Sequence, residues 1–507
     1  MNKSFCEKCK KLVATHPVER DGKVYLVKEC SECGATEALI SSDSERYFTK
    51  RSLDAGYTHD HCELNCLTCR HPRVPSFIFI DITNRCNLNC PICINNTPSM
   101  GFLFEPPMEY FEKIFRKLST FEPRPAVQLF GGEPTVRDDL FDMIKLAKSH
   151  GLPVRVVTNG MKLANEEYCR ELVQTRATIL IAYDGRNPET YRVLRGNASV
   201  LKAKIKAMEN LRKAGRAKVA LMTCVAKGFN DNEITDLLQT CHEWRDVVRG
   251  VYFMPLAHTW DAKDFKLEPD RMTTEEIEML LNRSFPGERI EFLPAGVFGS
   301  LPTLMRCLRI KPPPFAGAHP NCESMYFLIS DGEKYVPAAR YLKRPIPEAI
   351  RDLLELEKRL AQRVRAFESG RFARMLSAVG LKNAYLGAMG LRAVAGAYRR
   401  NVRTDRMFQG GKFGKYWHAM LFLLGLLFGR RTSPLLKRHT RVQGEIQLIV
   451  LPFEDTHVME TDRLERCPNA FAFVDPRDDE VRTVPVCAWG LHKKEAMRLV
   501  TEHYAKK

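Results

Sequence analysis

Residues 77–93 read FIFIDITNRCNLNCPIC, an apolar and β-branched run that leads into three cysteines. The run predicts a strand over residues 77–83, and the cysteines follow it in a loop with the spacing C-x3-C-x2-C. Cys86, Cys90 and Cys93 suffice to bind three irons of a [4Fe–4S] cluster, which leaves the fourth iron open to a small molecule. The pattern therefore predicts a cluster built for chemistry. The alternative is a zinc or redox site that takes its fourth ligand from elsewhere.

A second motif, Gly131-Gly132-Glu133-Pro134, lies one strand–helix step after the cysteine loop. Two glycines allow a ligand to approach the backbone closely. Pro134 lacks a backbone donor and stiffens the exit from the turn. Alone, this motif is also compatible with an ordinary turn, but its place directly after the cysteine loop favours ligand binding.

Together the two motifs resemble those of the radical S-adenosylmethionine (SAM) superfamily. The resemblance implies that Cys86, Cys90 and Cys93 hold the cluster, that SAM chelates the open iron and that residues 131–134 contact SAM. One electron then cleaves SAM to methionine and a 5′-deoxyadenosyl radical, which removes a hydrogen atom from the substrate. Ile92 departs from the family pattern, in which many members carry an aromatic residue, but an aliphatic side chain fits this packing position.

Between residues 76 and 256 the sequence alternates between six apolar strand candidates and helical stretches. The strand candidates are FIFID, AVQLF, PVRVVT, ATILIAY, KVALMTCV and GVYFMP. Such alternation predicts an α/β fold with a parallel sheet and right-handed crossovers. The resemblance makes this sheet a partial (β/α)6 barrel, whose site is expected at the carboxyl ends of its strands.

Polar residues stand at those expected strand ends. Thr158 and Asn159 follow the third strand, Asp184 follows the fourth and Asn230 follows the fifth. The resemblance implies that residues at such positions contact the ribose, carboxylate and adenine of SAM. Each is also compatible with an ordinary turn between strand and helix.

Four cysteines near the beginning of the chain form two CxxC pairs, Cys6 with Cys9 and Cys30 with Cys33. A hairpin-like stretch separates the pairs, and this spacing predicts a tetrahedral four-thiolate site, either a zinc ribbon or a rubredoxin-like iron centre. A module this small needs a bound metal to stabilise it, so we expect a structural role.

A second C-x3-C-x2-C motif, Cys62, Cys66 and Cys69, stands shortly before the first. No apolar strand precedes it and no GGEP follows it, so we interpret it as an auxiliary cluster loop. A zinc site completed by His59, His61 or His71 is the alternative.

Four more cysteines, Cys307, Cys322, Cys467 and Cys487, lie in the last third of the chain; Cys322 precedes one expected hairpin, and Cys467 and Cys487 flank another. They resemble the cluster-binding extensions of radical SAM enzymes. With the second loop they provide seven thiols, one fewer than two four-thiolate clusters need. We therefore expect one or two auxiliary [4Fe–4S] clusters, at least one of them with a different ligand. Cys169, Cys224 and Cys241 fit plain buried positions.

Residues 346–440 read as a helical insertion. Its apolar run, residues 416–428, is too short to span a bilayer. Aromatic residues at its ends (Tyr416, Trp417 and Phe428) and basic residues beyond them (Arg430, Arg431, Lys437 and Arg438) are typical of a helix at a membrane interface. A buried core helix and the wall of a channel for an apolar substrate are the alternatives.

The 507-residue chain has 78 Lys and Arg against 61 Asp and Glu, a net charge of +17. This excess indicates an anionic partner, a phospholipid surface or nucleic acid, although a generic basic surface gives the same count. The polar N-terminus lacks a secretory signal, and paired CxxC motifs then favour metal over disulfides. We expect a cytoplasmic protein, with peripheral contact at the inner face of the membrane as a further option.

These motifs predict four consecutive parts. They are a rubredoxin-like or zinc-knuckle module (1–50), an auxiliary cluster connector (51–75), the radical SAM partial barrel (76–300) and a C-terminal auxiliary cluster region that contains the helical insertion (301–507).

The order of these cysteine motifs resembles the tetraether lipid synthase branch, whose members are often labelled MoaA-like proteins or pterin methyltransferases. The stretches that carry this resemblance include CELNCLTC, LPFEDTHVMETDRLERC and PVCAWG. Archaeal members of the branch join two lipid tails through a carbon–carbon bond between unactivated methyl carbons.

We therefore hypothesise an enzyme that couples lipid chains, with a phospholipid or other lipid as substrate and ferredoxin or flavodoxin as reductant. The enzyme alternative is a radical SAM methyltransferase or pterin-modifying enzyme. The non-enzyme alternative is an iron–sulfur or zinc protein that binds nucleic acid, a partner we do not expect.

Overall fold

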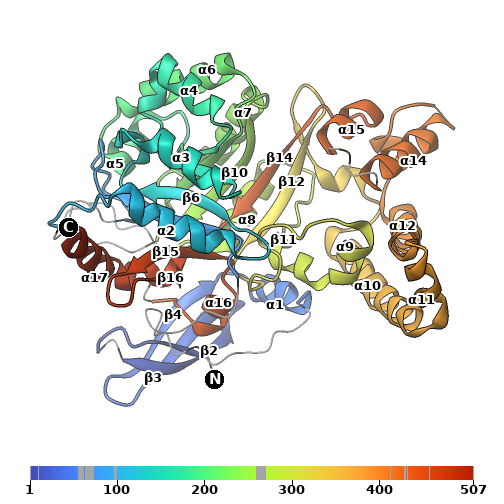
Figure 1. The fold of residues 1–507 in the computed structure, drawn as a ribbon, viewed down its shortest axis with the longest axis horizontal. Coiled ribbons are helices and arrows are strands. Elements are labelled where there is room, and N and C mark those ends of the chain that lie inside the picture. Colours follow the sequence, from blue (N-terminus) through green and yellow to red (C-terminus); the bar gives the residue numbers. More distant parts are fainter. Residues whose placement is uncertain are drawn as a thin grey trace. The chain divides into compact units, whose positions relative to one another are not determined.

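The structure is a computed structural model that describes residues 2–9, 11–54, 62, 74–95, 100–257, 270–411, 413–427, 430, 432–455 and 457–505. The chain forms two compact units (Figure 1). Unit 1 comprises Met1–Phe48, Tyr57–Leu280 and Ile449–Lys507, and unit 2 comprises Thr49–Gly56 and Leu281–Leu448.

Six parallel strands form the centre of unit 1. They are β5 (Phe77–Thr83), β6 (Ala126–Gly131), β7 (Val154–Thr158), β8 (Thr178–Ala182), β9 (Val219–Val225) and β10 (Val248–Pro255). Each pairs in parallel with the next in chain order. The predicted parallel α/β sheet is thereby confirmed, and its arrangement is consistent with a partial barrel.

Amphipathic helices connect these strands and follow the last of them. They are α2 (Met108–Ser119), α3 (Leu140–Ser149), α4 (Glu166–Gln174), α5 (Pro188–Arg195), α6 (Val200–Ala214), α7 (Ile234–Glu243) and α8 (Thr274–Arg283). In α2, Tyr110, Phe111 and Ile114 lie on the buried face, as a 3.6-residue period requires. Helix α5 begins with Pro188 after the capping side chain of Asn187 and ends at Gly196 in the left-handed conformation.

The C-terminal segment adds to the same sheet. Strand β15 (Asn469–Asp475) pairs in parallel with β5, and β16 (Glu480–Pro485) pairs antiparallel with β15, which confirms the second expected hairpin. Helices α16 (Thr461–Glu465) and α17 (Val486–Ala505) flank this hairpin in the sequence. From α17, Trp489 Nε1 and Lys493 Nζ donate to the buried Asp81 carboxylate of β5 over 2.8 and 3.1 Å.

Because β15 pairs with β5, the two compact units contain different residues from the four consecutive parts expected from the sequence. Residues 449–507 belong with the barrel strands, because β15 extends their sheet. Residues 281–448, which cross the expected boundary at 300, form most of unit 2. The four functional parts themselves stay a prediction.

The beginning of the chain folds into a separate antiparallel sheet of unit 1. Its strands are β1 (Lys3–Phe5), β2 (Leu12–Arg20), β3 (Lys23–Cys30) and β4 (Gly34–Ser41), followed by α1 (Ser44–Ser52), whose last residues belong to unit 2. The β2–β3 hairpin turns at Asp21 and Gly22, both with positive φ, as a two-residue hairpin turn favours.

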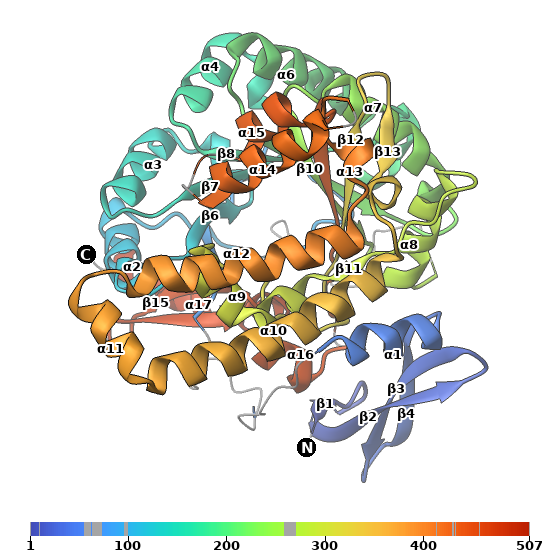
Figure 2. The ribbon, with the colours of Figure 1, turned by 90° about the vertical axis from the view of Figure 1, so that its right-hand side faces the viewer.

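Unit 2 is mainly helical, as expected for residues 346–440 (Figure 2). Its helices are α9 (Pro302–Leu308), α10 (Ile346–Ser369), α11 (Arg371–Ala378), α12 (Lys382–Asn401), α13 (Thr404–Met407), α14 (Gly414–Leu427) and α15 (Thr432–His439). Strand β11 (Leu293–Pro294) pairs with β12 (Ser324–Ser330), which forms the expected hairpin with β13 (Tyr335–Pro337). Strand β14 (Gly444–Val450) leads from unit 2 back into unit 1.

Candidate functional site: a cluster loop at the carboxyl ends of the parallel strands

The cysteine loop begins three residues after β5 ends at Thr83. Its apolar residues hold it in place: Leu88 packs against Tyr191 and Val200, and Ile92 packs against Leu194 and Cys224. Ile92 is buried, so an aliphatic residue fits this position as expected.

Within the loop, the backbone N–H of Leu88 donates to Cys86 Sγ over 3.4 Å, and that of Cys93 donates to the Cys90 carbonyl over 3.1 Å. Cys86 is exposed, while Cys90 and Cys93 are half-buried. A loop that is anchored by its apolar residues and leaves three thiols along one short turn fits a cubane, whose thiolates bind separate irons.

The two glycines of the second motif lie against this loop. Gly132 N donates to the Thr83 carbonyl over 2.7 Å, and Glu133 N donates to the Arg85 carbonyl over 2.8 Å. A Cβ on Gly131 would lie 2.2 Å from the Thr83 oxygen, and one on Gly132 would lie 2.1 Å from the Arg85 oxygen. The missing side chains of the glycines thus leave space for the backbone that leads to the cysteines. The sequence suggested instead that this space serves the approach of a ligand. Contact of residues 131–134 with SAM stays a prediction.

Glu133 connects the ends of two strands. Its buried carboxylate accepts hydrogen bonds from the Thr135 and Thr158 hydroxyls, each over 2.6 Å, and from the backbone N–H of Asn159 over 2.7 Å. Thr135 N adds a further bond of 3.1 Å. Four donors satisfy a buried carboxylate, so Glu133 holds the β6 and β7 ends together.

Asn159 extends this connection to the cysteine loop. Its Nδ2 donates to Asn87 Oδ1 over 2.7 Å, and its Oδ1 accepts from Met161 N over 2.9 Å. Hydrogen bonds therefore join three segments into one assembly at the carboxyl ends of the strands. These segments are the cysteine loop, the Gly-Gly-Glu-Pro turn and the Thr158–Asn159 step, which are separate in the sequence.

Two cations complete this assembly, the buried Lys204 and the largely buried Arg195. Arg195, the last residue of α5, binds the Asp184 carboxylate through Nε and Nη2 over 2.7 and 2.9 Å. Lys204 of α6 donates to the Asn159 carbonyl over 2.7 Å and to the Ala182 carbonyl. Burial raises the pKa of the Cys90 thiol, and Arg195 and Lys204 oppose that rise. Their charge therefore favours a thiolate at Cys90.

The ionisation of these groups follows their surroundings. Burial alone would raise the pKa of Asp184, but the neighbouring charges of Arg195 and Lys204 outweigh it and hold this pKa below its usual value. Burial, aided by repulsion from Arg195, lowers the pKa of Lys204 to about 8. The site thus keeps Asp184 ionised beside two cations.

Sequence reasoning missed Arg195, Lys204 and Asn87. A charged residue in an amphipathic helix normally points to solvent, so neither cation stands out in the sequence. Asn87 lies between the ligand cysteines, but only the folded position of Asn159 reveals its partner.

Asn230 uses its side chain within its own loop. Its Oδ1 accepts from Ala226 N over 2.8 Å, and its Nδ2 donates to the Cys224 carbonyl over 2.9 Å. The residue is buried and closes the turn after β9, which is the ordinary-turn alternative of the sequence analysis. Contact of Asn230 with SAM stays a prediction.

Cys169, Cys224 and Cys241 are buried, as expected.

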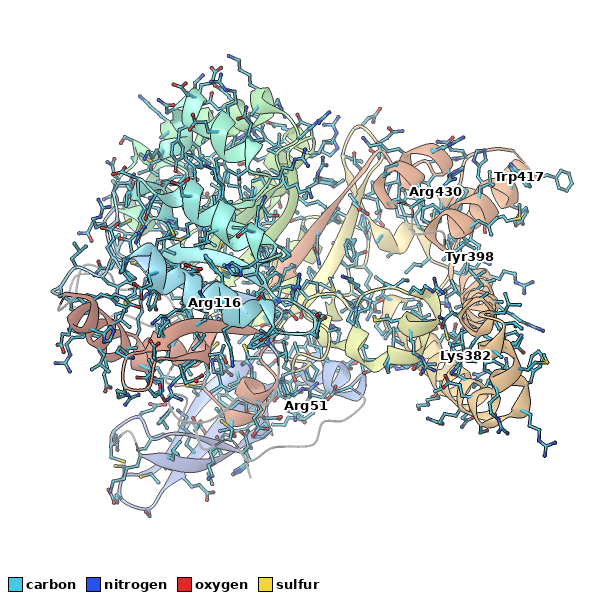
Figure 3. The ribbon with its side chains drawn as sticks, in the orientation of Figure 1. Arg51, Arg116, Lys382, Tyr398, Trp417 and Arg430 are labelled. Carbon is cyan, nitrogen blue, oxygen red and sulfur yellow. The ribbon has the colours of Figure 1, made fainter. Side chains whose placement is uncertain are left out.

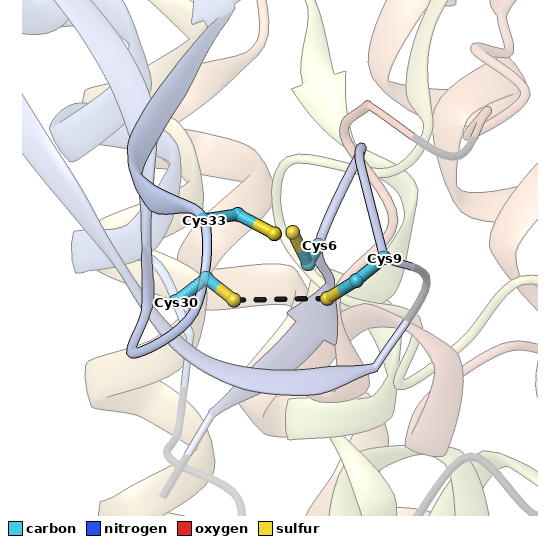
Figure 4. Close-up of side chains that lie close together, drawn as sticks. All are labelled: Cys6, Cys9, Cys30 and Cys33. Atoms are coloured by element: carbon cyan, nitrogen blue, oxygen red, sulfur yellow. Dashed lines mark hydrogen bonds between the residues drawn. The ribbon is translucent and has the colours of Figure 1, made fainter.

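The four N-terminal cysteines form the predicted metal centre (Figure 4). Their sulfur atoms all lie within 4.8 Å of one another, and Cys9 Sγ lies 3.7 Å from Cys30 Sγ. A hydrogen bond from the Cys9 backbone lowers the pKa of the Cys6 thiol to about 6. Four sulfur atoms this close together fit a tetrahedral Zn²⁺ or iron site.

Three of the expected auxiliary thiols lie near α16 and α17 in unit 1. The backbone N–H of Cys62 donates to Glu465 Oε1 over 2.6 Å, and Cys62 and Cys487 pack against the same apolar cluster, which contains Trp489. Cys487 Sγ accepts from Glu454 N over 3.4 Å, and Cys467 Sγ donates to the Asn469 carbonyl over 3.1 Å. Cys66, Cys69, His59, His61 and His71 lie outside the described residues.

The other two thiols belong to unit 2. Cys307 of α9 lies in an apolar cluster with Leu304, Leu360 and Leu386. Cys322 is buried two residues before β12, and its N–H donates to the His319 carbonyl over 2.9 Å. Within the described part of the chain, the four N-terminal cysteines form the one group of three or more Cys, His, Asp or Glu ligand atoms within 4.8 Å of one another. The auxiliary ligand sets stay predictions.

None of the helices in the described residues is long and apolar enough to cross a membrane. Of the residues expected at the ends of the apolar run, Phe428 and Arg431 lie outside the described residues, whereas Tyr416, Trp417, Arg430, Lys437 and Arg438 are exposed.

Comparison with known proteins agrees with this geometry. Residues 80–241 match the radical SAM superfamily, and residues 1–42 match the HMPTM N-terminal zinc ribbon domain. The chain is 33% identical over 354 residues to the 7,8-dihydro-6-hydroxymethylpterin dimethyltransferase of Methanocaldococcus jannaschii, which covers 67% of this chain and 70% of that protein.

Two further proteins are more distant. The GTP 3′,8-cyclase of Nautilia profundicola is 31% identical over 182 residues, which span 35% of this chain and 56% of the cyclase, less than two thirds of its length. The crystal structure of Streptococcus suis SuiB bound to S-adenosylmethionine is 13% identical, with a TM-score of 0.36, and covers 59% of this chain and 77% of SuiB.

This chain belongs to the radical SAM superfamily. It is a SAM-dependent enzyme that uses a [4Fe–4S] cluster and SAM, and it carries an N-terminal four-cysteine site for zinc or iron.

Proposed function

We propose that this enzyme removes hydrogen atoms from lipid hydrocarbon tails and joins two tails through a carbon–carbon bond, as in the tetraether lipid synthase branch. The observation that carries the proposal is the apolar side that α14 presents to solvent, where Tyr416 and Trp417 are each 59% exposed. A surface of this kind suits a substrate whose reacting part is a hydrocarbon.

The residues present fit the cofactor. Cys86, Cys90 and Cys93 would hold the cluster, which supplies, when bound, the electron that cleaves SAM to methionine and the 5′-deoxyadenosyl radical. Glu133 and Asn159 fix the loop and the strand ends at which SAM would bind. Arg195 and Lys204 offset the negative charge of the thiolates in a buried setting.

The proposed reaction balances with two SAM molecules. Each of two terminal methyl groups loses one hydrogen atom, and the two carbons form one new bond. The hydrogens leave in two molecules of 5′-deoxyadenosine, and two methionines are released. The two electrons come from a reductant such as ferredoxin or flavodoxin.

We further propose that Cys62, Cys66 and Cys69, with Cys467 or Cys487, hold an auxiliary cluster. Cys62 and Cys487 support this because both pack against one apolar cluster of unit 1. Cys322 and Cys307 would serve a second cluster, for which the apolar packing of Cys307 offers less support.

A second candidate is modification of a pterin. It is favoured by the name of the Methanocaldococcus jannaschii relative and by the GTP 3′,8-cyclases, to which this chain is also similar. This alternative needs a polar pocket for the pterin ring, and its product would be a methylated pterin.

One anaerobic experiment separates the candidates. The reconstituted enzyme is supplied with SAM, a strong reductant and either a total lipid extract or a reduced pterin. We expect 5′-deoxyadenosine in the lipid arm and a coupled lipid that has lost two hydrogen atoms, with two 5′-deoxyadenosines per product. Substrate lipids deuterated at the terminal methyl groups should pass deuterium to 5′-deoxyadenosine.

Cys90→Ala serves as the inactive control, and Cys169→Ala, a buried cysteine away from the loop, as its matched control. A methylated pterin with unchanged lipids would overturn the lipid proposal in favour of the second candidate. No 5′-deoxyadenosine in either arm, with clusters confirmed by spectroscopy, would contradict both.

A further inference from the structure

The positive charge of this chain is concentrated in residues 371–440. This segment contains 14 Lys and Arg and a single acidic residue, Asp405, whereas the whole chain has 78 and 61. The rest of the chain is therefore close to balanced. Among the residues that the structure describes, salt bridges engage only Lys382 and Arg400 of the 14. Most of this charge is available to a partner.

Helix α14 within this segment is apolar on two sides. Its inner side packs Ala419 and Phe422 against Phe408 and Leu435. Its outer side exposes Tyr416, Trp417, Met420 and Leu424 at helical spacing, and the exposed Phe413 directly precedes the helix. A helix that covers a core needs one apolar stripe, so the outer stripe requires a separate explanation.

A second exposed apolar group lies at the corner between α11 and α12. Phe372, Met375, Val379 and Leu381 are each about half exposed or more, with 62% for Val379. Arg371 and Arg374 alternate with them on α11, and both are exposed. The corner thus combines aliphatic and aromatic side chains with unneutralised guanidinium groups.

The helices that carry the two apolar groups lie on one side of unit 2. Figure 2 shows α11, α12 and α14 together on the side that faces the viewer. Figure 3 shows the same side edge-on, with Trp417 projecting away from the ribbon, Lys382 at the start of α12 and Arg430 between α14 and α15. Exposed Lys437 and Arg438 follow in α15.

We propose that α11, α12 and α14 form a docking surface for an anionic phospholipid bilayer. Apolar side chains would enter the boundary between headgroups and acyl chains, while the surrounding basic residues would contact lipid phosphates. Nucleic acid fits less well, because much of the exposed apolar surface is non-aromatic and offers no stacking surface to bases, namely Met420 and Leu424 on α14 and Met375, Val379 and Leu381 at the corner. The biological purpose of this docking surface rests on the proposed function, in which the substrate is a lipid. Its test is independent of catalysis.

The test measures vesicle binding by the full-length, reconstituted enzyme without SAM. Vesicles of phosphatidylcholine alone are compared with vesicles that contain phosphatidylglycerol, in flotation experiments. We expect binding to the anionic vesicles that weakens as salt is raised. The emission of Trp417 should shift to the blue on binding, and Trp417→Phe should lose that shift while still floating.

Two sets of variants test the two components of the surface. Met375→Asp combined with Trp417→Asp should lower vesicle partitioning by about tenfold or more, because both carboxylates would have to enter the interface. Arg430→Gln with Arg438→Gln should lower it by about fivefold for each charge removed. Ile310→Asp, at an exposed apolar residue of unit 2 outside the segment, is the matched control and should bind normally.

The outcomes are distinct. Equal binding of the Met375→Asp, Trp417→Asp variant and the wild type, or binding to nucleic acid without binding to anionic vesicles, would overturn the docking surface. Loss of vesicle binding with normal 5′-deoxyadenosine formation on detergent-dispersed lipid would support it. Vesicle binding by an enzyme that forms only a methylated pterin would keep the docking surface and reject the proposed function.

Discussion

Asn159 Nδ2 donates to Asn87 Oδ1 over 2.7 Å, which connects the end of β7 to the middle of the cysteine loop. The backbone N–H of the same residue binds Glu133, so one asparagine joins the three parts of the site. The position of the thiols therefore depends on side chains that are not ligands.

Asn87→Ala should slow SAM cleavage without emptying the cluster site. The lost hydrogen bond is exposed and contributes about 1 kcal/mol or less to stability, so the fold should persist. The loop would nevertheless lose its contact with β7, and 5′-deoxyadenosine formation should fall severalfold while iron content stays near wild type. Asn89→Ala in the same loop is the control, since no side-chain hydrogen bond of Asn89 is present among the described residues. Equal rates for the two variants would contradict a positioning role for Asn87.

Gly132→Ala should destabilise unit 1. The new methyl group would lie 2.1 Å from the Arg85 carbonyl oxygen, and relief requires movement of the backbone that leads to Cys86. We expect a loss of about 3 kcal/mol in the free energy of unfolding, the cost of overpacking a tight contact. Denaturant unfolding and iron content measure the effect.

Gly490→Ala is the matched control for that substitution. Nothing lies within 4 Å of its added Cβ, and it sits in helix α17, where alanine is favoured over glycine by about 1 kcal/mol. The two Gly→Ala changes should therefore move stability in opposite directions. A stability of Gly132→Ala at or above that of the wild type would refute the packing account.

Lys204→Met should make the cluster harder to reduce. Lys204 is buried and its charge favours a thiolate at Cys90, so its removal withdraws a positive charge that also stabilises the reduced cluster. The reduction potential should become more negative, on the order of 30–60 mV for this one-electron couple. Redox titration monitored by electron paramagnetic resonance gives the value. Lys202→Met, at an exposed position two residues earlier, should leave the potential unchanged.

Removal of the N-terminal metal should unfold the small sheet but spare SAM cleavage. Cys9→Ser breaks the four-sulfur set, and a module of this size has little other stabilisation. Metal analysis should show the loss of one zinc or non-cluster iron per chain, and limited proteolysis should cut within residues 1–48. Loss of 5′-deoxyadenosine formation in Cys9→Ser with an intact cluster spectrum would show that this module has more than a structural role.

Acidification should loosen α15 from α14. His439 Nδ1 lies 3.2 Å from His418 Nδ1, and burial, followed by repulsion from His418, lowers the pKa of His439. The folded state thus binds a proton at His439 less readily than the unfolded chain does. The contribution of His439 to folding stability is therefore fully present above the ordinary histidine pKa of about 6.5 and is lost as the pH falls below that value. Hydrogen exchange of the α15 amides should accelerate between pH 7.5 and 5.5 (both about one pH unit from that value). His439→Phe should remove the dependence.

The local parts of this fold were predictable because their signals are local. Alternating β-branched runs such as residues 77–83 predict strands, and paired CxxC knuckles predict a metal centre. The pairing of β15 with β5 was not predictable, since no local pattern specifies which distant strand completes a sheet edge. The same holds for Arg195 and Lys204, whose burial depends on carboxylate and carbonyl partners contributed by other elements.

The two glycines, Gly131 and Gly132, illustrate how far the site could be predicted from the sequence. Two adjacent glycines at residues 131 and 132 indicate a close approach to the backbone, but the sequence does not show which group approaches. In the structure that space holds the carbonyl groups of Thr83 and Arg85. A ligand and a neighbouring backbone impose the same requirement on the sequence, and only coordinates distinguish them.

The partnership of Asp81 with Trp489, 408 positions apart in the chain, has a consequence for biosynthesis. The strand that carries the cysteine loop is the first of the parallel strands to leave the ribosome, whereas its neighbour β15 and the helix that contributes Trp489 follow only after the other parallel strands have been synthesised. Until then one edge of β5 has no neighbouring strand, and the Asp81 carboxylate lacks its bond to Trp489. Pairings between such distant parts of the chain form slowly. Completion of the sheet edge at β5 is thus coupled to translation of residues 469–505, far downstream of the cysteines that follow the strand.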